Sequence, residues 1–169
     1  MKLHRKSSAF GALLLMLAST GGTAADLNIQ SGLGGTWYNR DQVGHGFFIN
    51  IARVNADLKF VVSWYTYHNG AAVWLTGSQT FNEGEQSVEV PVSQFNGAQF
   101  GSHFTSDDVV PTEWGTLTFN FSSCDKGVVQ YNPTLAEYDP GNIEISRLTN
   151  TVGAACKEMP SPLPLSERD

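Results

Sequence analysis

Apolar and polar residues alternate with a period of two along most of the chain from residue 35 onwards. In residues 58–67, one face carries Leu58, Phe60, Val62 and Trp64, and the other includes Lys59, Ser63, Tyr65 and Tyr67. Segments 46–54 and 117–121 alternate in the same way, and helical periodicity is nearly absent. Because successive side chains of a β-strand point to opposite faces, this pattern predicts half-buried β-strands.

Turn-forming residues separate the alternating segments at short intervals. Asn69-Gly70 is the strongest of these signals, since both residues tolerate the positive φ that a two-residue hairpin turn needs. Asn, Asp, Gly and Pro mark further turns at 55–57, 82–85, 125–127 and 138–142. We predict strands at 35–38, 46–54, 58–67, 71–80, 86–92, 114–121, 127–132 and 142–148. Residues 93–113 are predicted to form a longer connection.

About eight consecutive strands joined by short turns predict an all-β protein with an antiparallel up-and-down meander. An open sheet of this kind would expose two edges that invite aggregation. We therefore expect a closed or strongly curved barrel, with a β-sandwich as the alternative, because turn spacing does not separate the two.

The two ends of the chain differ from the alternating part. Residues 1–25 combine Lys2, Arg5 and Lys6 with an apolar run at 9–18 and a small-residue end, which is the order of an export signal. The apolar run is too short for a membrane anchor, which needs about 20 residues. We predict a signal peptide at 1–25, one β domain at 26–156 and a flexible Pro-rich tail at 157–169. The protein is expected to be exported, either to the periplasm or to the exterior.

Loss of the signal changes the charge of the protein. The chain has 10 basic and 16 acidic residues. Removing the three basic residues of the signal leaves 7 against 16, a net charge of −9. An acidic surface argues against nucleic acid and anionic membranes as partners. Cys124 and Cys156 are the two cysteines, and in an exported chain they are expected to form a disulfide rather than a metal or redox pair.

Local catalytic and metal-binding motifs are missing from the sequence. His45 lies between Gly44 and Gly46 at a strand start, where glycines allow a ligand or a sharp bend, so it is either a ligand contact or a loop-pinning residue. A hydrolase would pair His45 as a base with an acid such as Asp41 or Asp108. We expect no cofactor and no metal site, since none of His45, His68 and His103 lies close to another in sequence.

Aromatic residues give the better indication of a site. Trp and Tyr gather on three neighbouring predicted strands and fall on both faces of them. One face must be core, and the rings of the other would meet solvent or a cavity, where they can stack on sugars or apolar ligands. The predicted ligand-binding residues are Trp37, Tyr38, Trp64, Tyr65, Tyr67 and Trp74, with Arg40 and His45 at the mouth of the site.

Several of these segments carry a resemblance. The stretches GTWYNRDQVGHGF, SWYTYHNGAAVWLTG, VVPTEWGTLTFNFSSCDKGVV and IEISRLT resemble a family of small exported proteobacterial domains. The residues that recur in that pattern are Trp37, Tyr38, His45, Phe47, Trp64, Tyr65, Tyr67, Trp74, Trp114, Gly115 and Arg147. This resemblance implies an exported β domain and brings no activity. GTWYN is also similar to the first strand of avidin-like barrels, which favours a closed barrel without implying biotin binding.

The sequence thus predicts a non-enzymatic binding module that uses an aromatic-lined surface or cavity, with a glycan or a small apolar molecule as ligand. The first alternative is an envelope protein-interaction or structural module that binds its partner through a sheet edge. The hydrolase with His45 is the second alternative. The three differ in what surrounds the aromatic side chains and the His45 ring.

Overall fold

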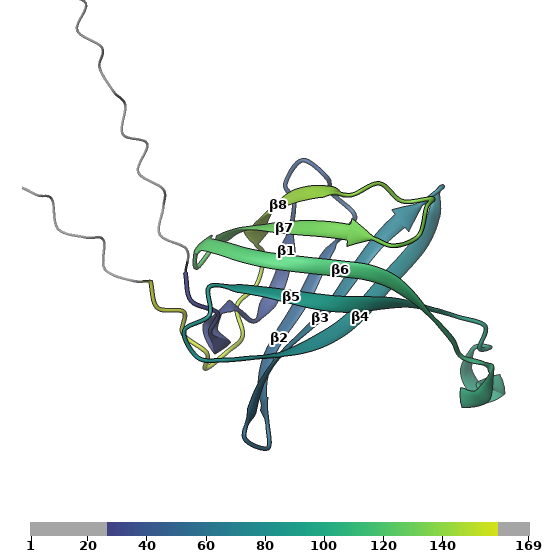
Figure 1. The fold of residues 1–169 in the computed structure, drawn as a ribbon, viewed down its shortest axis with the longest axis horizontal. Coiled ribbons are helices and arrows are strands. Elements are labelled where there is room, and N and C mark those ends of the chain that lie inside the picture. The colour runs from purple at the N-terminus through teal and green to yellow at the C-terminus, as the bar shows by residue number, and fades with distance from the viewer. Residues whose placement is uncertain (1–26, 159–169) are drawn as a thin grey trace, which may run out of the picture.

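The structure is a computed structural model that describes residues 27–158. The predicted signal peptide at 1–25 lies outside the described residues, as does the tail after Glu158. The described chain folds as an eight-stranded antiparallel meander that closes into a barrel in the order β1 to β8 (Figure 1). The predicted barrel is therefore confirmed.

The elements follow one another with few helical residues. The strands are β1 (Gly35–Tyr38), β2 (Gly46–Val54), β3 (Asp57–His68), β4 (Ala71–Phe81), β5 (Ser87–Asn96), β6 (Val110–Ser123), β7 (Lys126–Pro133) and β8 (Gly141–Arg147). Three short 3₁₀ helices are η1 (Ser31–Leu33), η2 (Gly101–His103) and η3 (Ser106–Asp108). No helix among the described residues is long and apolar enough to cross a bilayer.

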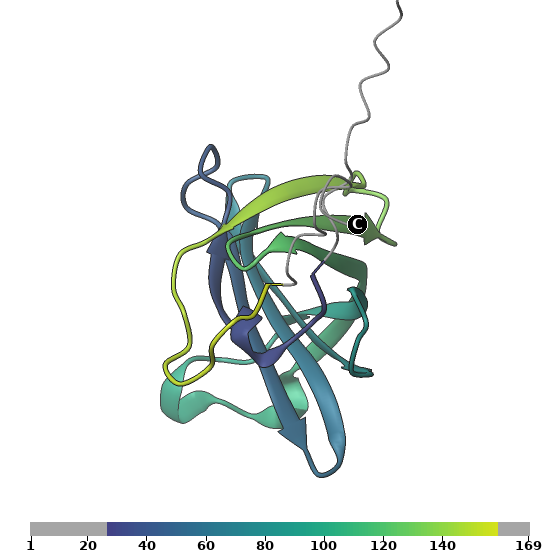
Figure 2. The same ribbon diagram turned by 90° about the vertical axis from the view of Figure 1, so that its left-hand side faces the viewer.

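The up-and-down connectivity gives the barrel two different ends. One end, the loop end, carries the connections at 39–45, 69–70, 97–109 and 134–140. The other, the terminal end, carries η1, the turns after β2, β4 and β6, and both ends of the described chain (Figures 1 and 2). Any site therefore belongs to the loop end, the terminal end, the interior or the outer wall.

Two ladders around the barrel are short. Barrel closure depends on the pairs Trp37–Arg147 and Tyr38–Ser146 between β1 and β8. The ladder between β4 and β5 covers three pairs, from Leu75–Gln94 to Gly77–Val92. Beyond Gln94, β5 no longer pairs with β4 and pairs with β6 alone. The 97–109 connection then extends outward as an arm (Figure 1).

The strand boundaries differ from the sequence prediction mainly around this arm. β5 runs to Asn96 rather than 92, and β6 starts at Val110 rather than 114. The added residues pair with one another on the far side of a β-bulge at Val92/Ser93. Pro111 and the bulge interrupt the period-two pattern there, which is why the sequence reads as a loop.

Large apolar side chains fill the barrel interior. The face of β3 predicted as apolar does point inward, with Phe60 and Val62 fully buried. Phe47 stacks on Trp64 with ring centres 5.2 Å apart and meets Phe119 edge-on at 5.7 Å. The buried set also includes Trp37, Leu75, Val90, Trp114, Leu117, Phe121, Val129 and Ile145. Packed rings of this size hold the two halves of the barrel together.

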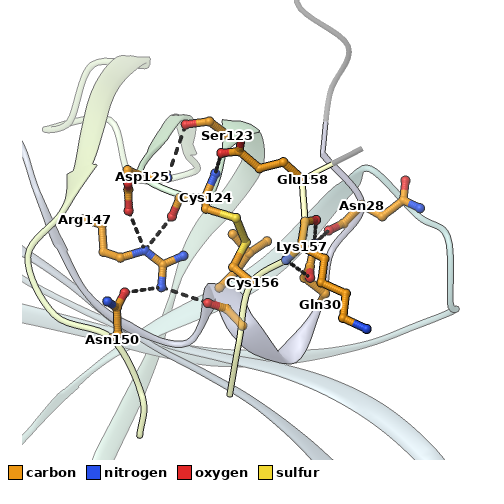
Figure 3. Close-up of a disulfide and its surroundings, with 12 residues drawn as sticks. Asn28, Gln30, Ser123, Cys124, Asp125, Arg147, Asn150, Cys156, Lys157 and Glu158 are labelled. Carbon is orange, nitrogen blue, oxygen red and sulfur yellow. Dashed lines mark hydrogen bonds and ion pairs between the residues drawn. A yellow bond between two sulfur atoms is a disulfide. The ribbon is translucent and has the colours of Figure 1, made fainter. Parts of the chain in front are cut away.

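Arg147 closes the terminal end. Its guanidinium lies over the Trp37 ring at 4.7 Å, and only 5% of its side chain is exposed. Nη1 donates to the Gly32 carbonyl at 2.8 Å, and Nε donates to the Cys124 carbonyl and faces the Asp125 carboxylate (Figure 3). One side chain thus joins β8 to the segment containing η1 and to the β6–β7 turn.

The predicted disulfide between Cys124 and Cys156 is present, with Cα atoms 5.8 Å apart. It ties the β6–β7 turn to the C-terminal segment (Figure 3). Gln30 holds the residue after Cys156 from the other side, since its side chain accepts from the Lys157 amide at 2.8 Å and donates to the Lys157 carbonyl at 2.9 Å. The C-terminal segment is therefore a fixed wall of the terminal end.

Candidate functional site

The predicted aromatic set is divided between the inside and the outside of the barrel. Trp37 and Trp64 are core residues, 0% and 5% exposed. Tyr65 is half-buried, whereas Tyr67 and Trp74 are 61% and 60% exposed. Of the predicted set, Tyr65, Tyr67 and Trp74 therefore lie together on β3 and β4 with their rings at least partly exposed.

These three side chains form a strip on the outer wall near the loop end. Tyr65 on β3 pairs directly with Trp74 on β4, so both side chains leave the same face of the sheet. Tyr67 pairs with Ala72, which leaves space beside its ring. Phe48 extends the strip onto β2, where its ring centre lies 5.2 Å from that of Tyr65. The outer aromatic strip is hereafter Phe48, Tyr65, Tyr67 and Trp74.

Trp74 stands between two hollows in the outer wall. A small hollow of about 150 Å³ is bounded by Tyr65, Tyr67 and Trp74, with Gly44 on the far side. A larger one of about 610 Å³ lies between Trp74, Phe95 and the arm at 97–109. Because Trp74 lines both, the hollows flank its ring and suit an extended ligand better than a compact one.

The arm contributes two further rings. Phe100 is 98% exposed and Phe104 is also exposed, and both line the larger hollow. Gly97 has φ +100 and a Cβ there would meet the Asp108 carbonyl oxygen at 2.2 Å, so glycine is needed where the arm leaves β5. Phe48, Phe95, Phe100 and Phe104 were not among the residues predicted from the sequence to bind a ligand. Phe48 was detectable, because it falls on the face of its strand opposite Phe47 and Ile49.

The lining of both hollows is uncharged. Around the rings, the described lining residues are aliphatic, glycine, Thr66 or the amides Asn96 and Gln99. Ser63 and Thr76 form the next outward-facing pair of β3 and β4, and the Ser63 hydroxyl donates a hydrogen bond to the Thr76 hydroxyl at 3.2 Å. In a chain with 16 acidic residues, an uncharged aromatic wall is a distinct surface.

His45 lies next to this wall and its hydrogen bonds define its protonation. Trp64 Nε1 lies 3.4 Å from His45 Nδ1, as does the Thr66 hydroxyl, and Nε2 lies 3.0 Å from the Gln42 side-chain oxygen. An indole N–H only donates, so Nδ1 must accept and the proton sits on Nε2. Burial lowers the pKa of His45. His45 thus pins the loop between β1 and β2 as a neutral ring.

Arg40, the other predicted mouth residue, is exposed on the 39–45 loop and is not among the described partners of His45. Tyr38, the remaining member of the predicted aromatic set, is half-buried at the end of β1. The carboxylates required for a hydrolase are not in contact with His45, whose described partners are Gln42, Trp64 and Thr66. Asp108 lies in η3 of the arm. The general-base pairing of the hydrolase alternative is therefore not formed.

Rings also close the mouth of the barrel at the loop end. Trp64 meets Trp114 edge-on at 5.8 Å and lies 5.5 Å from Tyr131, and Tyr138 covers Trp114 at 5.4 Å. Burial and the charge of Glu137 raise the pKa of the Tyr138 hydroxyl, and the nearby Trp114 N–H partly opposes this. That N–H nevertheless lacks a hydrogen bond of normal geometry within the described chain. The mouth is thus filled by rings.

No group of three or more His, Cys, Asp or Glu side chains among residues 27–158 is placed to hold a metal ion. Comparison with known proteins adds no further assignment, because no protein family, curated protein or solved structure matches the chain. The function must therefore be argued from the geometry of the barrel itself.

Proposed function

We propose that this protein is an exported binding module whose outer aromatic strip binds a neutral glycan. The observation that carries the proposal is the exposed ring of Trp74, held between two hollows and beside the exposed ring of Tyr67. Flat rings of Trp and Tyr present an apolar face with a polar edge, which matches the apolar faces and outward hydroxyls of a sugar. The disulfide agrees with export.

The surroundings of Trp74 favour a glycan over a small apolar molecule. The hollows are open grooves on the wall, and an apolar ligand would keep much of its surface in water there, whereas most ligand pockets enclose their ligand. The amides of Asn96 and Gln99 line the larger hollow and can hydrogen-bond sugar hydroxyls. Charge favours a neutral glycan, because the acidic protein repels polyanions.

The alternative of a protein-interaction module has less support. Its proposed mode was strand addition at a sheet edge, and closing the barrel removes most of that edge. The exposed rings themselves could still pair with a second copy of the chain. An experiment on the strip must therefore distinguish glycan binding from self-association.

The proposal is tested by affinity electrophoresis in gels that contain soluble neutral polysaccharides, such as mixed-linkage β-glucan, xylan or glucomannan. We expect at least one of them to retard the wild-type protein, and Trp74→Ala or Tyr67→Ala to abolish the retardation. Val128→Ala is the matched control, because Val128 is a part-exposed apolar residue on β7, away from the strip. Loss of glycan binding in Val128→Ala would contradict the proposal. So would a wild-type protein that binds no glycan but forms a dimer, if Trp74→Ala makes that dimer monomeric.

A further inference from the structure

The terminal end holds a larger cavity than the small hollow beside Trp74. It has a volume of about 580 Å³, within the range of small-ligand sites. The N-terminal segment, the β2–β3 hairpin, the turn after β4 and the C-terminal segment each contribute to its lining. The outer aromatic strip lies at the opposite end of the barrel, so the two sites share no lining residue.

The floor of this cavity is aliphatic and held in place by the backbone. Its apolar lining residues are the aliphatic Leu27, Ile29, Ile51, Ala52 and Leu58 and one aromatic residue, Phe81. The Leu27 amide donates to the Phe121 carbonyl at 2.6 Å, and the Ile29 amide donates to the Glu85 carbonyl at 2.7 Å. These bonds fix the N-terminal segment across the barrel end, so the floor is preformed.

Among the described residues, the rim of the cavity carries two cations, Arg53 and Lys157, and one anion, Glu83. Arg53 faces Glu83 at 3.4 Å and also donates to the Ala56 carbonyl, so its charge is partly neutralised. The backbone of Lys157 is held by Gln30, while its ammonium has no ion pair within residues 27–158 (Figure 3). The part of the rim between residues 27 and 158 is therefore net positive on an otherwise acidic protein.

We propose that this cavity binds a single-chain aliphatic carboxylate, a free fatty acid, with its alkyl chain on the aliphatic floor and its carboxylate beside Lys157. The aliphatic floor suits an alkyl chain rather than a sugar, because most of it offers no flat ring for stacking. The unpaired ammonium suits an anionic head group. This site is independent of the proposed glycan strip.

The disulfide is part of the proposed site. Cys156 directly precedes Lys157, and Cys124 anchors it to the β6–β7 turn. The disulfide and Gln30 together fix the backbone that carries the free ammonium. Lys157 is thus positioned from both sides at the rim of the cavity.

Isothermal titration of the full mature protein with dodecanoate and with dodecanol, both kept below micelle-forming concentrations, tests the proposal. We expect wild type to bind both and to prefer dodecanoate. Lys157→Glu should weaken dodecanoate binding about fivefold, because a factor of this size corresponds to one exposed ion pair. The same variant should leave dodecanol binding unchanged, because dodecanol has no charge. Leu58→Trp should weaken both ligands, because the larger ring fills the cavity.

The control variant is Trp74→Ala, which should bind both ligands as wild type does because it changes only the outer wall. Near-UV circular dichroism shows whether each variant is folded, and Lys157→Glu on the surface provides the test if Leu58→Trp does not fold. The proposal is overturned if wild type does not bind dodecanoate, or if Lys157→Glu affects both ligands equally. Binding to phosphatidylglycerol vesicles without binding to monomeric dodecanoate would also overturn it. None of these results bears on glycan binding at the strip.

Discussion

At the residue scale, the most informative side chain is Arg147. A buried guanidinium must satisfy its donors, and this one does so with carbonyls of Gly32 and Cys124, the Asp125 carboxylate and the Trp37 ring. Only Nη2 lacks a partner in the described chain. The sequence did not predict these contacts, because Gly32 and Trp37 lie more than 100 residues before Arg147 in the chain.

Replacing Arg147 by Met should destabilise the protein by about 3 kcal/mol. The change leaves several buried carbonyl oxygens without a donor and removes the cation from the Trp37 ring. Chemical denaturation with urea measures the loss. Arg147→Lys is the control: it keeps the charge but cannot reach several partners at once, so we expect an intermediate loss. A wild-type stability for Arg147→Met would contradict the assigned role.

His45 predicts a pH dependence with a definite sign. Burial lowers its pKa in the folded state, so the folded protein binds its proton less readily than the unfolded chain. The stability from neutral His45 is therefore present above about pH 6.5, the unfolded value, and is lost as the pH falls toward the lower folded pKa. His45→Gln should lose less stability than wild type between pH 7 and pH 5.

Urea denaturation at the two pH values measures this difference. His103→Gln is the matched control, because His103 is exposed on η2 of the arm, outside the 39–45 loop. The control should keep the wild-type difference between pH 7 and pH 5. An unchanged difference in His45→Gln would show that the imidazole does not pin the loop.

At the element scale, regular hairpins were predictable and the irregular connection was not. Asn69 and Gly70 have φ values of 49° and 79°, as the Asn-Gly signal predicts for a two-residue turn. The sequence predicted that β5 ends at residue 92, whereas the strand continues to Asn96. The β-bulge and Pro111 interrupt the period-two pattern, so the pairing beyond the bulge was not predicted. Local chemistry dictates a turn, whereas a bulge depends on the partner strand.

Gly70→Ala should destabilise the protein by about 1 kcal/mol. Nothing lies within 4 Å of a Cβ at this position, so the effect comes from the positive φ alone. Thermal denaturation measures the change. Asn69→Gly is the matched control and should be close to neutral, because glycine adopts the same φ without strain. Equal losses in both variants would argue against this turn geometry.

Loss of the disulfide should destabilise the protein by about 4 kcal/mol, since its loop of 32 residues no longer restricts the unfolded chain. The double variant Cys124→Ala/Cys156→Ala, compared with wild type in urea, measures this. Adding dithiothreitol to wild type should reproduce the loss and leave the double variant unchanged. A double variant as stable as oxidised wild type would contradict the clamp role.

At the scale of the whole molecule, alternation predicted the strands and the apolar face of β3, and the structure decided between a barrel and a sandwich. Trp64 shares a face with Phe60 and Val62, so the sequence placed its ring on the apolar side and that of Tyr65 on the other. The structure confirms this division, because Phe60 and Val62 are buried. The meeting of rings from β2, β3 and β4 in one outer strip required the three-dimensional arrangement, because it depends on the register of these strands.

The division also predicts opposite results at two tryptophans. Trp64→Ala should cost about 4 kcal/mol, because it opens a cavity among Phe47, Trp114 and Tyr131. Trp74→Ala should change the melting temperature little, because its ring is mostly in water. Differential scanning calorimetry compares the two, and equal losses would show that Trp74 is a structural residue.

The most direct test of the central claim uses tryptophan fluorescence. Of the four tryptophans, Trp37, Trp64 and Trp114 are buried and only Trp74 is exposed, so acrylamide quenching reports mainly on Trp74. We predict that a bound neutral polysaccharide protects wild type from quenching and has no effect on Trp74→Phe. Quenching that no neutral polysaccharide reduces, or protection that persists in Trp74→Phe, would contradict the outer strip as the binding surface.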